Sequence, residues 1–148
     1  MRKTSIYVAG GSSEALLVAT MIDKLEAEGF ECTYNWTDEV LNPKQSLEQL
    51  SRIQRLNIAS TDYSAVRKSD LVWVILPEVN SIGASAEMGA AIVLGVPLIV
   101  SGPHHRSAMT APANWMFTGH EEAFDFICNY LDDFNVVRSR FFPRSAKV

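Results

Sequence analysis

Apolar residues along this chain occur in two patterns, short continuous runs and stretches with helical periodicity. The clearest run covers residues 70–76, and its β-branched composition is typical of a strand buried on both faces. A polar loop at 80–86 and a helix at 87–95, rich in small residues and ended by Gly95, are expected next. Residues 96–100 predict another strand. Together these pieces form a β–α–β unit, whose loop lies at the carboxyl end of a parallel strand, where such sheets bind ligands.

The residues before this unit predict two strands and a helix between them. The strands are expected at 5–9 and 32–36, and the helix is capped by Ser12 or Ser13 and ended by Gly29. Apolar residues of this helix recur at intervals of three or four, at Leu17, Val18, Met21, Ile22 and Leu25.

The segments on either side of residues 70–102 complete the pattern. A polar loop is expected at 37–46 and a further helical turn or two at 61–69, with a brief strand at 115–117. A second amphipathic helix is predicted by the spacing of Leu47, Leu50, Ile53 and Leu56. A final helix follows Gly119 and has an apolar side made of Phe124, Ile127, Cys128, Leu131 and Phe134.

Alternating strands and helices predict an α/β fold. We expect a doubly wound, five-stranded parallel sheet in the flavodoxin-like order 2-1-3-4-5, with helices on both faces. One domain should cover residues 1–134, and residues 135–148 should form a C-terminal tail with basic side chains around Phe141 and Phe142. At 148 residues the chain is long enough to bury a core.

Composition and charge narrow the functional classes. The chain is 47% hydrophobic and 20% charged, as expected for an ordinary globular protein, and it has no run long enough to span a bilayer. A formal charge of −4 argues against nucleic acid as a general partner. Cys32 and Cys128 lack metal-type spacing and indicate reduced thiols in a cytoplasmic protein, since no signal peptide precedes the first strand.

Two loops could hold an anionic group. Residues 10–13 (Gly-Gly-Ser-Ser) follow the first strand, and residues 81–85 follow the third. Each offers backbone N–H groups and hydroxyls at the start of a helix, where a phosphate or carboxylate is favoured. Taken singly, either loop is also explained by turns and helix caps, and neither matches the Walker A or dinucleotide fingerprint.

Glu87 is the sharpest chemical feature. We expect this glutamate in the first turn of an almost wholly apolar helix, at the rim of a buried element facing the loop. It is a candidate nucleophile or general acid/base, and dipole stabilisation of the helix is the alternative. Asp62 is a weaker candidate for a chemical role, and Asp70 is better explained as a turn or cap residue. Tyr7 is by default a core aromatic.

Basic and aromatic residues near the same sheet edge are further candidates. His104 and His105 lack a third ligand at metal-type spacing, so we expect no metal, and Arg106 with Ser107 could help to hold an anion. Trp36 could stack on a flat ring, or serve in the core or an interface.

Several of these segments resemble the nucleoside 2-deoxyribosyltransferase superfamily, including its branch of deoxynucleoside 5′-monophosphate N-hydrolases. The resemblance covers roughly residues 5 to 102 and is most specific at the Glu-x-Gly-x-Ala helix after a Gly/Ser loop. It is carried by Ile6-Tyr7-Val8-Ala9-Gly10, Ser69-Asp70-Leu71-Val72, Gly83-Ala84-Ser85-Ala86-Glu87-Met88-Gly89-Ala90-Ala91 and Gly95-Val96-Pro97.

The resemblance implies roles for individual residues. Glu87 corresponds to the nucleophile that cleaves an N-glycosidic bond, Asp62 to an assisting aspartate and Tyr7 to the tyrosine of the first strand. Substrate or phosphate contacts are implied for Gly10, Gly11, Ser12, Ser81, Gly83, Ser85 and Ser107, and base stacking for Trp36. The family chemistry proceeds through a glycosyl-enzyme intermediate, as in retaining glycosidases.

The resemblance leaves three functions open. The first is N-glycosidic cleavage of a nucleoside 5′-monophosphate, which the serines favour, although Glu14 in the first loop should repel phosphate. The second is a deoxyribosyltransferase that exchanges bases, and the third is a non-catalytic nucleotide-binding or signalling module on the same fold. We expect a small-molecule nucleoside or nucleotide as partner, no cofactor, and a homodimer or higher homo-oligomer.

Overall fold

Five parallel strands form the centre of the protein, in the order β2-β1-β3-β4-β5. The computed structural model describes residues 2–103 and 106–130. Within these ranges the strands are β1 (Ser5–Ala9), β2 (Glu31–Cys32), β3 (Leu71–Ile75), β4 (Leu98–Ser101) and β5 (Trp115–Phe117). The predicted fold class and strand order are confirmed.

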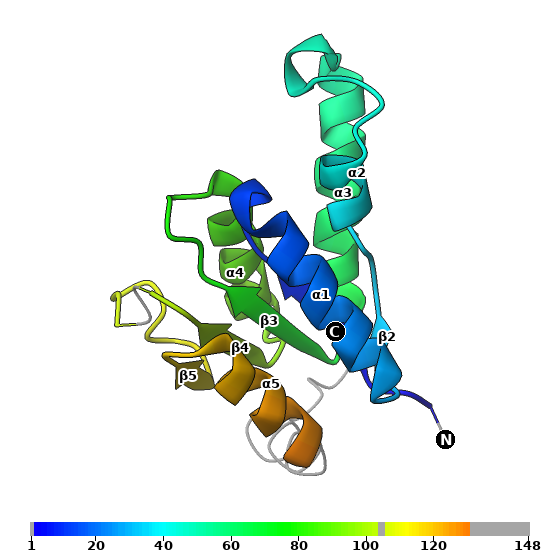
Figure 1. The fold of residues 1–148 in the computed structure, drawn as a ribbon. Helices are drawn as coiled ribbons and strands as arrows, with labels where there is room; N and C mark the ends of the chain where they lie inside the picture. Colours follow the sequence, from blue (N-terminus) through cyan, green and yellow to red (C-terminus); the bar gives the residue numbers. More distant parts are fainter. Residues whose placement is uncertain (1, 104–105, 131–148) are drawn as a thin grey trace, which may run out of the picture.

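Helices cover both faces of this sheet (Figure 1). The α-helices are α1 (Ala15–Ala27), α2 (Thr37–Leu41), α3 (Arg52–Lys68), α4 (Ile82–Leu94) and α5 (His120–Asn129), and two short 3-10 turns are η1 (Ser12–Glu14) and η2 (Leu47–Gln49). α1 and α5 pack on one face, whereas α3 and α4 pack on the other. The amino-terminal part of α3 and the segment that joins it to α2 extend beyond the sheet (Figure 1).

The central strands send alternate side chains to the two faces. On β1, Ile6 and Val8 join the core under α1 and α5, whereas Tyr7 and Ala9 join the core under α3 and α4. All five residues of β1 are buried, and so are all five of β3. This burial on both faces explains why the central strands read as continuous apolar runs. It also places Tyr7 beneath the pair α3 and α4.

The predicted strand at 32–36 and the polar loop at 37–46 need correction. β2 contains only Glu31 and Cys32, and the chain turns into α2 where a loop was expected. Asn35 causes the turn, because its side-chain oxygen accepts hydrogen bonds from both the N–H and the hydroxyl of Thr37. Trp36, predicted at the end of a strand, is the N-cap of α2.

The helices on the other face also start and end differently from the prediction. α3 is one continuous helix through 61–69 up to Lys68, begun by a capping box between Ser51 and Gln54. The amphipathic pattern that predicted a buried side from Leu47 to Leu56 was wrong, because Leu47, Ile53 and Leu56 are 74%, 72% and 61% exposed. These three residues lie on the part of the chain that extends beyond the sheet, where no strand covers them.

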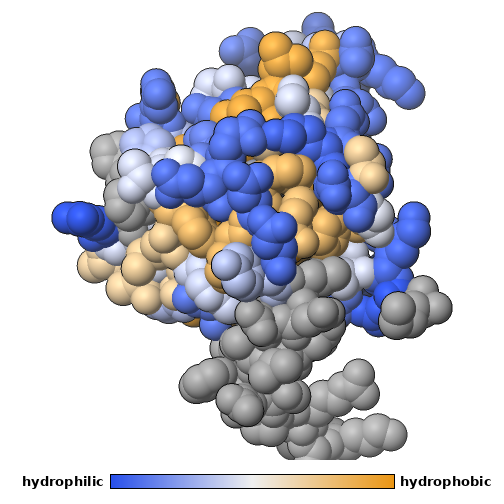
Figure 2. All heavy atoms as spheres, turned by 60° about the horizontal axis from the view of Figure 1, so that its bottom comes forward, coloured by the Kyte–Doolittle hydropathy of each residue, from blue (hydrophilic) through white to orange (hydrophobic). Residues whose placement is uncertain are grey.

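Large hydrophobic side chains remain at the surface of this single chain. Fourteen are exposed within the described residues. On the face seen in Figure 2, hydrophobic residues gather near the centre, crossed by hydrophilic ones, and again at the upper end. Surfaces of this kind mark contacts with other molecules more often than isolated exposed side chains do.

Some expectations fall on residues that the structure does not describe. His104, His105, Leu131, Phe134 and the tail at 135–148 lie outside the described residues. Cys32 and Cys128 are free thiols, both half-buried. No helix within residues 2–103 and 106–130 is long and apolar enough to cross a membrane.

Candidate active site

Glu87 and Tyr7 form a buried pair between α4 and the sheet. The Tyr7 hydroxyl donates a hydrogen bond to Glu87 Oε1 over 3.0 Å. Tyr7 is fully buried and Glu87 is only 7% exposed. Glu87 Oε2 is buried and has no hydrogen-bond partner within the described part of the chain. A buried oxygen without a partner is costly in free energy, so this carboxyl group is a candidate for binding or chemistry.

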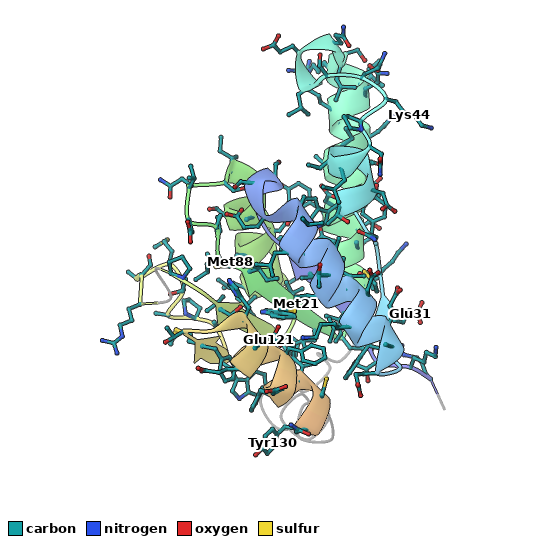
Figure 3. All side chains as sticks on the ribbon, in the orientation of Figure 1. Met21, Glu31, Lys44, Met88, Glu121 and Tyr130 are labelled. Atoms are coloured by element: carbon teal, nitrogen blue, oxygen red, sulfur yellow. The ribbon has the colours of Figure 1, made fainter. Side chains whose placement is uncertain are left out.

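The sequence of α4 explains why this glutamate faces inward. Ser81 caps the helix by accepting a hydrogen bond from Ala84 N–H over 3.2 Å, and Gly95 ends it in a left-handed conformation with φ of 67°. The helix therefore begins five residues before the predicted start, and Glu87 lies in its second turn rather than its first. The inward side of α4 consists of Ala84, Glu87, Met88 and Ala91. Met88 points toward the sheet beside α4 (Figure 3).

Asp62 joins this pair from α3. It is half-buried, and its Oδ1 also lacks a hydrogen-bond partner within the described residues. Its charge raises the pKa values of both Glu87 and Tyr7, so the three groups share one site although they lie on three different elements. These residues come together because α3 and α4 pack on the same face of the sheet. Tyr7 and Glu87 are 80 positions apart in the sequence.

Burial shifts the pKa of every group in the cluster. It raises the pKa of Glu87 to about 8, and the charge of Asp62 adds to this rise, whereas the Tyr7 hydrogen bond lowers it. Burial and the charge of Glu39 raise the pKa of Asp62 to about 6. Burial and the two carboxylates raise the pKa of Tyr7, so its hydroxyl stays protonated and donates. Two carboxyl groups with raised and separated pKa values suit general acid and nucleophile roles.

Glu39 and Tyr34 belong to the surroundings of this site and were missed by the sequence analysis. The Tyr34 hydroxyl donates a hydrogen bond to Glu39 Oε1. Burial raises the pKa of Tyr34, and this hydrogen bond and the charges of Glu39 and Asp62 add to the rise. No sequence signal pointed to Glu39, because residues 37–46 read as a polar loop.

Two of the glycines predicted to bind substrate occupy tight positions at the carboxyl edge of the sheet. A Cβ atom on Gly10 would lie 2.7 Å from Val18 Cγ2. A Cβ atom on Gly11 would lie 2.6 Å from Glu14 Oε2 and 3.3 Å from Ser81 Cβ. The structure therefore places the loop after β1 beside the cap of α4.

The other predicted substrate contacts lie at the surface. Ser12, Gly83 and Ser85 are exposed, and Ser85 precedes Glu87 by two residues, which places it on the other side of α4. Ser107 is exposed in a turn, where its Oγ accepts a hydrogen bond from Met109 N–H over 3.3 Å. Their roles in binding stay predictions.

Trp36 is half-buried and attached to the sheet. Its Nε1–H donates a hydrogen bond to the carbonyl oxygen of Val8 over 2.8 Å, and its indole packs against both cores. Its Cζ2 atom lies 3.7 Å from the position of a Cβ on Gly10. These contacts place the indole next to the first loop, while its predicted stacking on a base stays a prediction.

A chain of hydrogen bonds links three further elements on the other face of the sheet. Trp73 Nε1–H donates to Ser101 Oγ over 2.8 Å, and Ser101 Oγ shares a hydrogen bond of 2.8 Å with His120 Nδ1. Burial lowers the pKa of His120, so the imidazole is mostly neutral at pH 7. The sequence analysis did not predict His120 as a site residue, because no motif marks its position at the start of α5.

Asp70 lies at the opposite edge of the sheet from Glu87, and its contacts explain its place there. Its Oδ2 accepts hydrogen bonds from the N–H and the hydroxyl of Ser5, each over 3.0 Å, and its carboxylate pairs with Arg2. These contacts lie at the amino ends of β1 and β3, away from Glu87. Asp70 therefore joins the amino ends of β1 and β3, whereas the sequence predicted a turn or cap residue.

A cavity of about 500 Å³ lies beside α3, between this helix and the segment after β2. Its walls come from Thr33, Tyr34, Asn57, Ser60, Thr61, Ser64, Ala65 and Lys68. Neither Glu87 nor Asp62 lines it. Glu87 is 7% exposed and its Oε2 atom is fully buried, so little of its carboxyl group is open to solvent.

Comparisons with known proteins show the fold. BlsM, solved in solution, superposes with a TM-score of 0.63 at 18% identity over 98% of each chain. A conserved protein from Enterococcus faecalis V583 gives 0.61 at 16% identity over 84% of this chain and 96% of its own. The CMP N-glycosidase BcmB from Clostridium botulinum gives 0.52 at 17% identity over 84% of this chain and 98% of its own. No family model and no curated protein sequence matches.

Proposed function

We propose that this protein is an N-glycosidase of the nucleoside 2-deoxyribosyltransferase superfamily, acting on a nucleoside or its 5′-monophosphate, with Glu87 as the nucleophile. The observation that carries the proposal is the buried Tyr7–Glu87 hydrogen bond beside Asp62, with one oxygen of each carboxyl group left without a partner among residues 2–103 and 106–130. The shared fold with a CMP N-glycosidase supports it.

The chemistry follows from the positions of the three side chains. The reactive form has Glu87 ionised and Asp62 protonated, and it is the minor form between pH 6 and 8 because the pKa of Glu87 is the higher of the two. In this form Glu87 attacks the anomeric carbon C1′, and the bond from C1′ to the base nitrogen breaks as Asp62 supplies a proton to the departing base. This leaves a glycosyl ester on Glu87. Water then attacks C1′, aided by the Asp62 carboxylate, and releases the free sugar and the glutamate. Tyr7 holds Glu87 Oε1, which leaves Oε2 to react.

The test is release of free base. Purified protein is incubated with a panel of nucleosides and their 5′-monophosphates, and the free base is measured by chromatography. We expect base release by the wild type and by Glu48→Gln, an exposed acid in η2, and none by Glu87→Gln. Equal activity of the Glu87→Gln variant would refute the proposal. Addition of a free acceptor base distinguishes hydrolysis from base exchange, because a transferase then forms a new nucleoside.

We also propose that a second copy of the chain packs on the outward side of α4. Ile82 and Val93 on this side are 91% and 86% exposed. Gly89 lies between them, and a Cβ there would meet no atom within 4 Å, so the position leaves room for a closely approaching helix. This side of α4 carries no charged residue, since Glu87, the helix's one ionisable side chain, points inward. Such a surface is typical of homodimer interfaces.

Sedimentation equilibrium tests the homodimer. Val93→Glu should convert the dimer to monomer, because a charge at the centre of an apolar interface must be desolvated. Leu47→Glu is the matched control, since Leu47 is similarly exposed but lies on η2, far from α4. A wild-type protein that sediments as a monomer, or a Val93→Glu protein that stays dimeric, would contradict the proposed interface.

A further inference from the structure

The Glu14 carboxylate connects two loops at the carboxyl edge of the sheet. Its Oε1 accepts a hydrogen bond from the backbone N–H of Glu78 over 3.3 Å, and its Oε2 accepts one from Ser13 Oγ over 2.9 Å. The loop after β1 thereby joins the loop after β3. A side-chain carboxylate already occupies the N–H group of Glu78, which would otherwise be free to bind an anion.

Glu14 also lies on the side of Glu87 where the far end of a bound sugar must be. Its Oε2 and Ser81 Cβ both lie close to the position of a Cβ on Gly11, at 2.6 and 3.3 Å. Ser81 caps α4 six residues before Glu87, or about 9 Å along the helix axis. Helix side chains lean toward the N-terminus, so Glu87 points back toward this cap. A sugar with C1′ at Glu87 can extend its 5′ carbon toward Ser81 and Glu14.

The charges at this edge disfavour a phosphate. The charges that act on His120 are those of Glu14 and Glu121, both acidic, and burial outweighs them and lowers the pKa of His120 below its ordinary value. A 5′-phosphate would carry about −1.5 to −2 charges into contact with the Glu14 carboxylate. Arg106 and Ser107, the residues expected to hold an anion from the loop after β4, are both exposed.

We infer that Glu14 determines substrate specificity by accepting a hydrogen bond from a free 5′-hydroxyl and excluding a 5′-phosphate. The substrates are therefore unphosphorylated nucleosides, in place of the monophosphates that the serines had favoured. This inference rests on the proposed function, because it concerns the same site. It assigns Glu14 to specificity and leaves the chemical step to Glu87.

The experiment compares kcat/KM for the four 2′-deoxynucleosides and their 5′-monophosphates in the wild type and three variants. Glu14→Gln keeps the acceptor for the Glu78 N–H and removes the charge, and Glu14→Lys reverses the charge. Glu78→Gln is the matched control, because it removes one negative charge from an exposed side chain of the adjoining loop after β3. Circular dichroism confirms that each variant folds. Inhibition by inorganic phosphate gives a second measurement that does not depend on the nucleotide substrate.

We expect the wild type and Glu78→Gln to prefer nucleosides about 100-fold, since like charges in contact cost several kcal/mol. Glu14→Gln should reduce this preference at least about tenfold and become sensitive to phosphate, and Glu14→Lys should reduce it further. If the wild type cleaves monophosphates as well as nucleosides, or if Glu14→Gln leaves the ratio unchanged, the inference is wrong while the glycosidase function stands. If no substrate releases base in any protein, the proposed function fails and the inference with it.

Discussion

Replacing Glu87 by glutamine should abolish activity and stabilise the fold in a way that depends on pH. The pKa of this carboxyl group is raised from 4.5 to about 8 in the folded protein. Between these two values the folded state binds more protons than the unfolded state, so the stability of the wild type falls as the pH rises through this window. Glutamine has nearly the same shape and does not ionise, so Glu87→Gln lacks this loss of stability.

The size of the effect follows from the pKa values. Each pKa unit corresponds to about 1.4 kcal/mol, so the difference between 4.5 and about 8 amounts to roughly 5 kcal/mol above pH 8 and roughly 3 kcal/mol at pH 7. Because Glu87 is 7% exposed, solvent screens little of this. The raised pKa of Asp62 adds a loss of stability at lower pH. That loss is common to both proteins and cancels in the comparison.

Urea denaturation at pH 4.5 and at pH 8.5 measures the effect. Glu87→Gln should differ little from the wild type at the lower pH and be more stable by several kcal/mol at the higher pH, with unchanged m-values. The exposed Glu48→Gln variant controls for removal of a charge. A stability difference that is equal at the two pH values, or a variant that is less stable than the wild type at pH 8.5, would refute the argument from burial.

Three further predictions concern the same elements. Tyr7→Phe removes a hydrogen bond that lowers the pKa of Glu87, so kcat/KM should fall about 10- to 100-fold and the optimum of the pH–rate profile should move to higher pH. The wild-type profile should be bell-shaped with apparent pKa values near 6 and 8, and Asp62→Asn should leave a single limb that rises with the ionisation of Glu87, at an apparent pKa below 8 because the Asp62 charge no longer raises the pKa of Glu87. Gly102→Ala should destabilise the fold by about 1–3 kcal/mol in urea, since Gly102 has φ of 107° and a Cβ would lie 2.7 Å from His120 Cε1, and unchanged stability would contradict the local geometry.

The candidate site was only partly predictable from the sequence. Glu87 stood out because it was the one acidic residue in an otherwise apolar helix, and the resemblance to a known family added Asp62 and Tyr7. The start of α4 was misplaced by five residues, because the residues at 82–86 (Ile-Gly-Ala-Ser-Ala) are mostly small and are compatible with both loop and helix. No local sequence pattern pointed to Glu39 or His120. They approach the site edge only because α2 and α5 pack where they do.

By itself the sequence determined the alternation of strands and helices, the double burial of the central strands and the position of Gly95 at the end of α4, because all of these depend on near neighbours in the chain. Only the tertiary structure decided that Tyr7 donates to Glu87, that Asp62 joins them, and that Glu14 connects two loops. Those contacts depend on how helices pack on a shared sheet, which brings together residues separated by up to 80 positions. The same packing left Leu47, Ile53 and Leu56 exposed, although their spacing is typical of a buried helix face.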